Sequence, residues 1–272
     1  MKYILPYVDT TKRTYIEPFL GSATMLINIL SEKRYEKYYV NDFNSDLILF
    51  FQILQQEDAI EDFSGQISDL CTIYNSLTDI DAKQTFFYTI RSLYNEAKVN
   101  DSTRATFFWF LTKTCFNGVY RINLKGEYNV PFGKKQRIAV DIDQLLALSE
   151  SIREVHFFSM DYMEFMRYLV KESLLIDSFI YLDPPYIPET KTSQKQKMYT
   201  TNFFEHDRYI DFMNVIGQTE KNSLMISMSD SSYSEEIYGK LHLKKTTIAD
   251  ITRVVNPKAL LRSKEVIYTN YL

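Results

Sequence analysis

Short apolar runs rich in valine, isoleucine, phenylalanine and tyrosine recur along the chain and alternate with longer amphipathic stretches. Such runs predict buried strands, and apolar positions spaced three and four residues apart predict helices. The expected strands lie around Tyr15–Ile16, Tyr38–Val40, Val155–Phe158, Phe179–Leu182, Leu224–Met228 and Val266–Tyr268. The expected helices cover Ser22–Leu30, Ser45–Gln55, Met160–Glu172 and His206–Gln218. Alternating strands and helices indicate βαβ units around a mostly parallel sheet, so the predicted fold class is α/β.

The alternation stops in the middle of the chain. Helical patterns follow one another near Ile60–Tyr74, Ala82–Lys98 and Arg104–Phe116, and a glycine-containing stretch typical of a hairpin comes next. We therefore expect residues 1–55 and 151–272 to form a sheet domain. Residues 56–150 would form a helical and hairpin lobe inserted into it.

Composition limits the classes of function. The 272 residues carry a formal net charge of −4, so a nucleic-acid partner would need a locally basic surface. The 21 tyrosines and 19 phenylalanines suit either a core or stacking on bases. Two cysteines and three scattered histidines provide neither a disulfide framework nor the spacing of a metal site. The chain shows no signal-peptide pattern and no apolar run near the roughly 20 residues of a membrane span, so we expect a cytoplasmic protein without a membrane partner.

The tetrapeptide Asp183-Pro184-Pro185-Tyr186 directly follows the apolar run Phe179–Leu182. A carboxylate, two proline carbonyls and an aromatic ring thus follow a predicted buried strand, where open α/β sheets form their ligand crevices. These groups can accept hydrogen bonds from an amino group and stack on a flat ring. The alternative is a structural Pro-Pro turn.

Two further strand ends carry polar residues. In the stretch from Glu17 to Ala23, Gly21 permits a tight turn and Ser22 can cap the following helix. Asp42 comes 21 residues after Gly21, the spacing at which an acidic residue binds ribose hydroxyls, but a single glycine taken in isolation favours an ordinary βα turn. Asp161 after Val155–Phe158 could accept an exocyclic amine, or could simply be a helix N-cap.

The stretch from Phe116 to Lys135 contains alternating segments on both sides of Lys125-Gly126, a pattern typical of a hairpin. Arg121 can donate two hydrogen bonds to a guanine edge, while Asn117 and the aromatic residues can probe or wedge a base stack. Lys134 and Lys135, with Arg137 beyond them, offer phosphate contacts. A solvated hairpin with incidental charge is the alternative.

In this order, these blocks resemble the Dam-type DNA adenine-N6 methyltransferases over most of the chain. The resemblance rests on Glu17–Gly21, Asn41–Asn44, Phe116–Gly118 with Asn129–Gly133, Asp183–Tyr186 and the tail Ser263–Tyr271. It implies a Rossmann-like methyltransferase sheet with helices on both faces and an inserted target-recognition lobe. It also implies methyl transfer from S-adenosyl-L-methionine to a flipped adenine of double-stranded DNA, in GATC or a longer site containing GAT.

The resemblance assigns roles to individual residues. Phe19, Gly21 and Ser22 would line the methionine side of the cofactor, Asp42 its ribose, and Asp161 and Tyr162 its adenine. Asp183, also counted as a cofactor residue, would act with Pro184, Pro185 and Tyr186 on the target base. The DNA-binding residues would be Asn117, Val119, Arg121, Asn129, Pro131, Lys134 and Lys135.

The chain departs from the family pattern at its start. Members generally begin with a Lys-Trp-x-Gly-Gly-Lys-like segment, whereas this chain begins Met1-Lys2-Tyr3-Ile4-Leu5-Pro6, and Ala23 replaces a usual glycine. The segment could lie upstream of Met1, could come from a partner chain, or could be absent from a protein with weak or no binding of cofactor or DNA. The last case gives the alternative function, a silent homologue that serves as the DNA-binding subunit of a two-chain enzyme. Methylation of RNA or of glutamine ranks lower, because glutamine-modifying relatives carry asparagine at the position of Asp183.

Overall fold

The computed structural model describes residues 3–96, 101–184, 211–212, 222–231, 234–235, 238–239, 241, 243–256 and 259–272. The described residues form two compact units. The first contains residues 3–43 and 154–184 together with the described residues after 210, and the second contains residues 44–153. No helix in the described part of the chain is long and apolar enough to cross a membrane.

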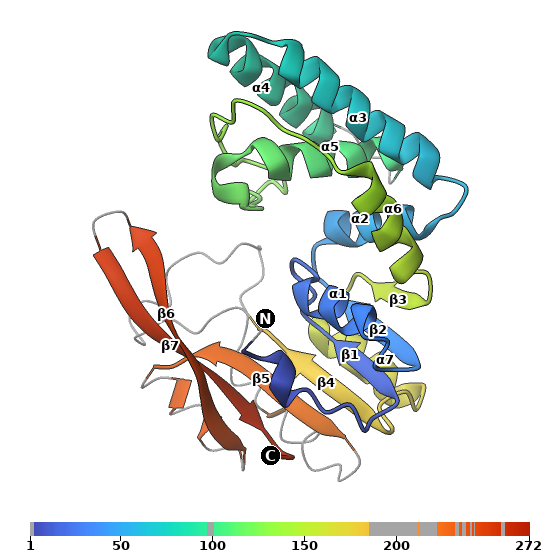
Figure 1. Cartoon of the computed structure of the whole chain (residues 1–272), viewed down its shortest axis with the longest axis vertical. Helices are drawn as coiled ribbons and strands as arrows, with labels where there is room; N and C mark the ends of the chain where they lie inside the picture. The colour runs from blue at the N-terminus through green and yellow to red at the C-terminus, as the bar shows by residue number, and fades with distance from the viewer. Residues whose placement is uncertain are drawn as a thin grey trace. The chain divides into compact units, whose positions relative to one another are not determined.

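A seven-stranded sheet dominates the first unit (Figure 1). Its strands are β1 (Thr14–Glu17), β2 (Lys37–Asn41), β3 (Val155–Phe158), β4 (Ser178–Leu182), β5 (Ser223–Ser229), β6 (Lys244–Asn256) and β7 (Ala259–Thr269). The strand order is β3-β2-β1-β4-β5-β7-β6. The first five strands run parallel, whereas β7 pairs antiparallel with both β5 and β6. The mixed α/β architecture confirms the predicted class and is consistent with a Rossmann-like methyltransferase fold, although β6 was not predicted.

The two faces of the sheet are both covered. On one face, Ile16 and Ile180 join a core cluster with Phe165, Met166 and other apolar residues of α7 (Tyr162–Lys171). Tyr15 and Phe179, which directly precede these two isoleucines, point to the other face because side chains alternate along a strand. There Tyr15, Tyr35 and Phe179 form an aromatic group, with the rings of Tyr35 and Phe179 stacked at 6.1 Å. The short helix η1 (Leu5–Tyr7) precedes β1.

The helix after β1 begins later than the sequence indicates. Helix α1 covers Thr24–Ser31, and its N-cap is Ala23, whose φ of 55° lies in the left-handed region. The prediction that Ser22 caps the helix is therefore wrong; the Ser22 hydroxyl instead lies 2.7 Å from that of Thr24. The left-handed backbone at Ala23 explains in physical terms why glycine suits this position.

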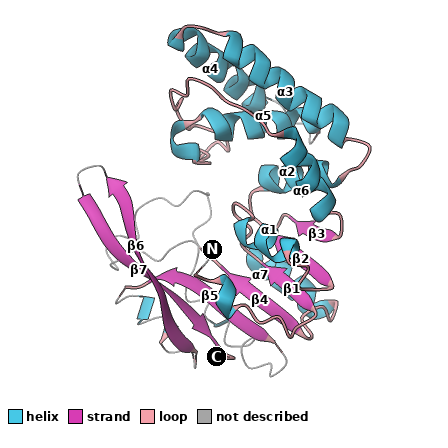
Figure 2. Ribbon diagram, in the orientation of Figure 1, coloured by secondary structure: helices cyan, strands magenta, loops and turns pink. Residues whose placement is uncertain are grey.

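The second unit is helical (Figure 2). Its helices are α2 (Ser45–Gln55), α3 (Ile60–Ser76), α4 (Ile80–Glu96), α5 (Ser102–Thr114), the short η2 (Phe116–Gly118) and α6 (Ile142–Ser151). Between η2 and α6 the chain makes the predicted hairpin. Ile122 pairs with Tyr128, and the Gly126 N–H closes the turn by donating to the carbonyl of Asn123 at 2.9 Å. The sequence missed α6, and the boundaries proposed for the catalytic core and the recognition lobe stay a prediction.

Some predictions lie outside the described residues. They are Pro185, Tyr186, and the helix expected over His206–Gln218 apart from residues 211–212.

Candidate functional site

The centre of the sheet is the place where the strand order reverses. The chain goes from β1 outward through β2 and β3, then returns to place β4 against the other side of β1 and continues to β5. Strands β1 and β4 are parallel, with Ile16 opposite Ile180. In such sheets ligands bind beyond the carboxyl ends of the strands at this reversal. The segments beginning at Pro18 and Asp183 both follow those ends.

A buried asparagine ties three strand ends together. Asn41 closes β2, and its side-chain amide donates to the carbonyls of Pro18 and Met160, each at 3.1 Å. Its amide oxygen accepts the N–H of Met160 at 3.1 Å. The loops after β1, β2 and β3 are thereby held in one hydrogen-bonded arrangement. Asn41 was not among the predicted site residues, although a polar residue closing an apolar strand is a signal that could have found it.

The glycine turn and the acidic residue after β2 contact each other. Gly21 has a φ of +48°, and its N–H donates to the Asp42 carboxylate at 2.8 Å. A Cβ atom at Gly21 would meet nothing within 4 Å, so the turn faces open space in the described structure. Two predicted cofactor residues, 21 positions apart, therefore meet at this edge.

The end of β3 brings a second predicted pair to the same edge. Asp161 is the N-cap of α7, and its carboxylate accepts the Met163 N–H at 2.9 Å. The cap geometry favoured by the sequence is thus present, and it fixes the carboxylate at the strand end. Tyr162 packs its ring 5.2 Å from that of Phe19, which follows β1. The aromatic pair joins the loops after β1 and β3.

Acidic groups converge where β1 and β4 end. Glu17 is buried, and Tyr15 donates its hydroxyl proton to the Glu17 carboxyl group at 2.8 Å. Burial raises the pKa of Glu17 well above its usual value, and the nearby carboxylates of Asp183 and Asp42 act in the same direction. Asp183 itself is exposed, while Pro184 beside it is buried. The structure thus brings Asp42 and Asp183 within electrostatic reach of one carboxyl group, which the sequence had not identified as part of the site.

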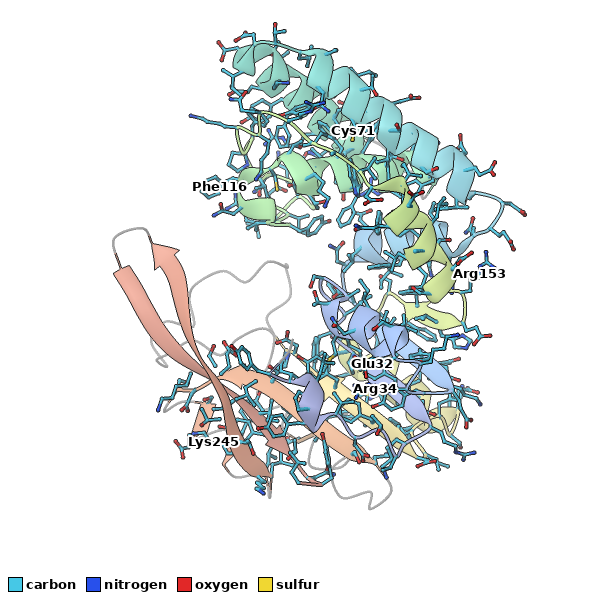
Figure 3. All side chains as sticks on the ribbon, viewed as in Figure 1. Glu32, Arg34, Cys71, Phe116, Arg153 and Lys245 are labelled. Atoms are coloured by element: carbon cyan, nitrogen blue, oxygen red, sulfur yellow. The ribbon has the colours of Figure 1, made fainter. Side chains whose placement is uncertain are left out.

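The second unit holds the predicted recognition residues. Arg121 is exposed, and its Nε donates to the side-chain oxygen of Asn129 at 2.7 Å. Asn117 is exposed and has a φ of 56°, and Phe116 before it is 56% exposed. Figure 3 shows Phe116 just beyond the last turn of α5. Val119 is half-buried.

The extended chain after the hairpin lies against α5. Gly133 donates its N–H to the Thr114 carbonyl at 2.8 Å, and Phe116 donates to Pro131 at 2.9 Å. A Cβ atom at Gly133 would lie 2.2 Å from the carbonyl oxygen of Cys115, so only glycine allows this approach. Pro131, Lys134 and Lys135 are exposed around it.

The buried carboxylate of Asp46 holds Tyr120, which lies among the predicted recognition residues. Asp46 in α2 pairs with the Arg104 guanidinium, with Nη2 at 3.0 Å, and also accepts the Tyr94 hydroxyl. Tyr120 donates its hydroxyl to the same carboxylate at 3.1 Å. Burial and the nearby Asp46 carboxylate raise the pKa of Tyr120 to about 12, so its hydroxyl remains a donor at neutral pH. Tyr120, which lies between Val119 and Arg121, is therefore anchored in the helical core of the second unit.

Comparison with known proteins gives a consistent result. The family model described as D12 class N6 adenine-specific DNA methyltransferase matches residues 1–254. The Type II methyltransferase M.MjaIII of Methanocaldococcus jannaschii is 30% identical over 269 residues, covering 95% of this chain and 89% of that protein. The DNA adenine methylase of Haemophilus influenzae is 28% identical, with 94% of this chain and 84% of that protein covered. The DNA adenine methylase of Escherichia coli is 26% identical, with 88% and 83% covered.

Proposed function

Because this chain belongs to the D12 class N6 adenine-specific DNA methyltransferase family, we propose that it methylates a flipped adenine within GATC or a longer site containing GAT. The observation that carries the proposal is the convergence of Gly21, Asp42 and Asp183 at the carboxyl ends of neighbouring strands. A methyl donor and an acceptor amine must meet at one place, and this edge provides polar groups suited to both.

The residues at this edge fit S-adenosyl-L-methionine, which a methyltransferase family implies. Asp42 would accept hydrogen bonds from ribose hydroxyls, and Asp161 would accept one from the adenine amine. Phe19 and Tyr162 offer aromatic surface between the two loops. The turn at Gly21, with Ser22, would approach the methionine part. Several carboxylates at one strand edge also suit a positively charged ligand. When bound, the cofactor supplies a methyl group on a positively charged sulfur.

The target amine would be held by Asp183 and the Pro184 carbonyl. An adenine N6 nitrogen is a poor nucleophile because its lone pair conjugates with the ring. Two acceptors that draw its N–H bonds out of that arrangement aim the lone pair toward the methyl group. Such catalysis works by positioning and charge placement. The base must leave the duplex first, at a cost of a few kcal/mol, and Tyr186, supported by Pro185, would stack on it.

Sequence choice would come from the second unit. Asn117, Val119, Arg121 and Pro131 would contact base edges, and Asn129, Lys134 and Lys135 would assist at the DNA surface. The exposure of Arg121 and Pro131, and the fixed guanidinium of Arg121, support this assignment. Several relatives are named DNA adenine methylase, which supports an adenine target in double-stranded DNA.

The test is transfer of a labelled methyl group. The chain is incubated with labelled S-adenosyl-L-methionine and duplexes that contain or lack GATC. The expected result is label on N6 of adenine in the GATC duplex, abolished by Asp183→Ala. Glu154→Ala is the matched control. This exposed carboxylate directly precedes β3, so it lies at the amino end of that strand and away from the carboxyl ends that carry Asp183. Absence of transfer, together with absence of cofactor binding by calorimetry, would refute the proposal and favour a DNA-binding homologue without activity.

A further inference from the structure

The hairpin that carries Arg121 has few backbone hydrogen bonds of its own. Ile122 and Tyr128 form an isolated bridge, the Asn129 N–H donates to the Arg121 carbonyl at 3.1 Å, and the Asn123 N–H donates to the Glu127 carbonyl at 2.8 Å. An isolated two-stranded hairpin is only marginally stable in water. Its conformation must therefore depend on contacts with the helices beneath it.

Asn95, in the last described turn of α4, takes the place of a neighbouring strand. Its side-chain oxygen accepts the N–H of Tyr128 at 2.8 Å, and its side-chain nitrogen donates to the Tyr128 carbonyl at 3.1 Å. One side chain thus binds both polar backbone groups of one residue, as a paired strand would. Two further contacts reinforce this point: Arg91 donates to the Val130 carbonyl at 3.2 Å, and the rings of Tyr94 and Tyr128 lie 5.9 Å apart.

The two hydrogen bonds between Asn95 and Tyr128 lie next to Asn129, the residue that orients Arg121. Asn129 directly follows Tyr128. The side-chain oxygen of Asn129 accepts a hydrogen bond from Nε of Arg121. A bidentate contact with a guanine edge requires the guanidinium plane to be aligned with the base. A shift of the Tyr128 backbone would move Asn129 and thereby tilt the guanidinium. Asn95 contacts neither Arg121 nor Asn129 through any described hydrogen bond, so its effect must pass through the backbone.

We propose that Asn95 is a positioning residue for sequence choice, which holds the hairpin so that Arg121 reads one base pair without Asn95 touching DNA itself. This inference rests on the proposed function. It adds to that function an exposed residue of helix α4, whose position in an amphipathic helix had given no sign of a role.

The chain contains a matched control. Asn75 in α3 binds the backbone of Ile138 in the same way: its nitrogen donates to the carbonyl at 2.7 Å, and its oxygen accepts the N–H at 3.1 Å. Ile138 lies beyond the predicted base-reading residues. Asn95→Ser and Asn75→Ser therefore remove equivalent pairs of hydrogen bonds, and only the first pair adjoins Asn129.

The experiment measures kcat/KM for the preferred duplex, taken first as one that contains GATC. It also measures kcat/KM for duplexes in which one base pair of that site is changed. Their ratio is independent of the fraction of enzyme that is folded. For Asn95→Ser we expect the ratio to fall roughly tenfold or more at the base pair read by Arg121. For Asn75→Ser we expect it to stay close to the wild-type value. Asn95→Asp keeps an acceptor for the Tyr128 N–H but loses the donor, so its ratio should lie between those of wild type and Asn95→Ser.

The outcomes separate the two proposals. An active wild-type enzyme whose discrimination changes equally in Asn95→Ser and Asn75→Ser refutes the positioning role alone. A wild-type chain that methylates no duplex and binds no cofactor refutes the proposed function, and the positioning role with it.

Discussion

The close approach at Gly133 gives the sharpest prediction about stability. In Gly133→Ala the new methyl group would stand 2.2 Å from the carbonyl oxygen of Cys115 and 2.9 Å from that of Thr114. Both obstacles are backbone atoms, so the extended segment around Gly133 must move away. That movement would weaken the hydrogen bond from the Gly133 N–H and that from Phe116 to Pro131. Overpacking costs about 1–3 kcal/mol and each lost hydrogen bond about 1 kcal/mol. We expect a loss of about 2–4 kcal/mol of unfolding free energy.

The assay is urea-induced unfolding followed by tryptophan fluorescence. Trp109 is the one tryptophan of the chain and lies buried in α5, in the same unit as Gly133. The control, Gly65→Ala, lies in α3 where a Cβ atom meets nothing within 4 Å. There the change should raise stability by about 0.5–1 kcal/mol, because alanine favours a helix. If the urea midpoint of unfolding of Gly133→Ala equals that of the wild type, the steric reasoning is wrong.

Three further changes test other parts of the structure. Because burial raises the pKa of Glu17 in the folded chain above its unfolded value, the contribution of Glu17 to stability falls as pH rises above about 4. The stability of Glu17→Gln relative to wild type should therefore grow between pH 4 and 8 in urea titrations; a constant difference would contradict the shift. Arg121→Ala should reduce discrimination at one guanine by about 1–3 kcal/mol in kcat/KM, and an unchanged preference would remove Arg121 from the reading set. Tyr120→Phe removes a hydrogen bond to the buried Asp46 carboxylate and should cost about 1.5–3 kcal/mol of unfolding free energy. An unaltered urea midpoint would show that this bond is not made in solution.

The buried strands could be predicted from the sequence because their hydrophobic runs are continuous. The strand Val155–Phe158 has the predicted bounds, and β4 begins one residue earlier than predicted. Since Asp42, Asp161 and Asp183 follow such strands, the pattern also indicated that they share one edge of the sheet. Parallel strands with both faces covered leave a strong signal in sequence.

The missed features depend on weaker or longer-range signals. Strand β6 lies at the edge of the sheet and begins with Lys244-Lys245-Thr246-Thr247, which lacks an apolar run. Helix α6 buries little apolar surface, with Leu145 and Ser149 as its buried residues. Asn41 and Asn95 act through atoms that are 23 to 119 residues away, and no local pattern reveals such partners.

Strands β2 and β3 are parallel neighbours, and all the described residues of the second unit lie in the connection between them. All described residues proposed for methyl transfer belong to the first unit, and all those proposed for DNA reading belong to the second. Residues 44–153 thus form a cassette. Exchange of this cassette between homologues should transplant target preference while the chemistry stays with the recipient, which offers a route to methyltransferases of altered specificity.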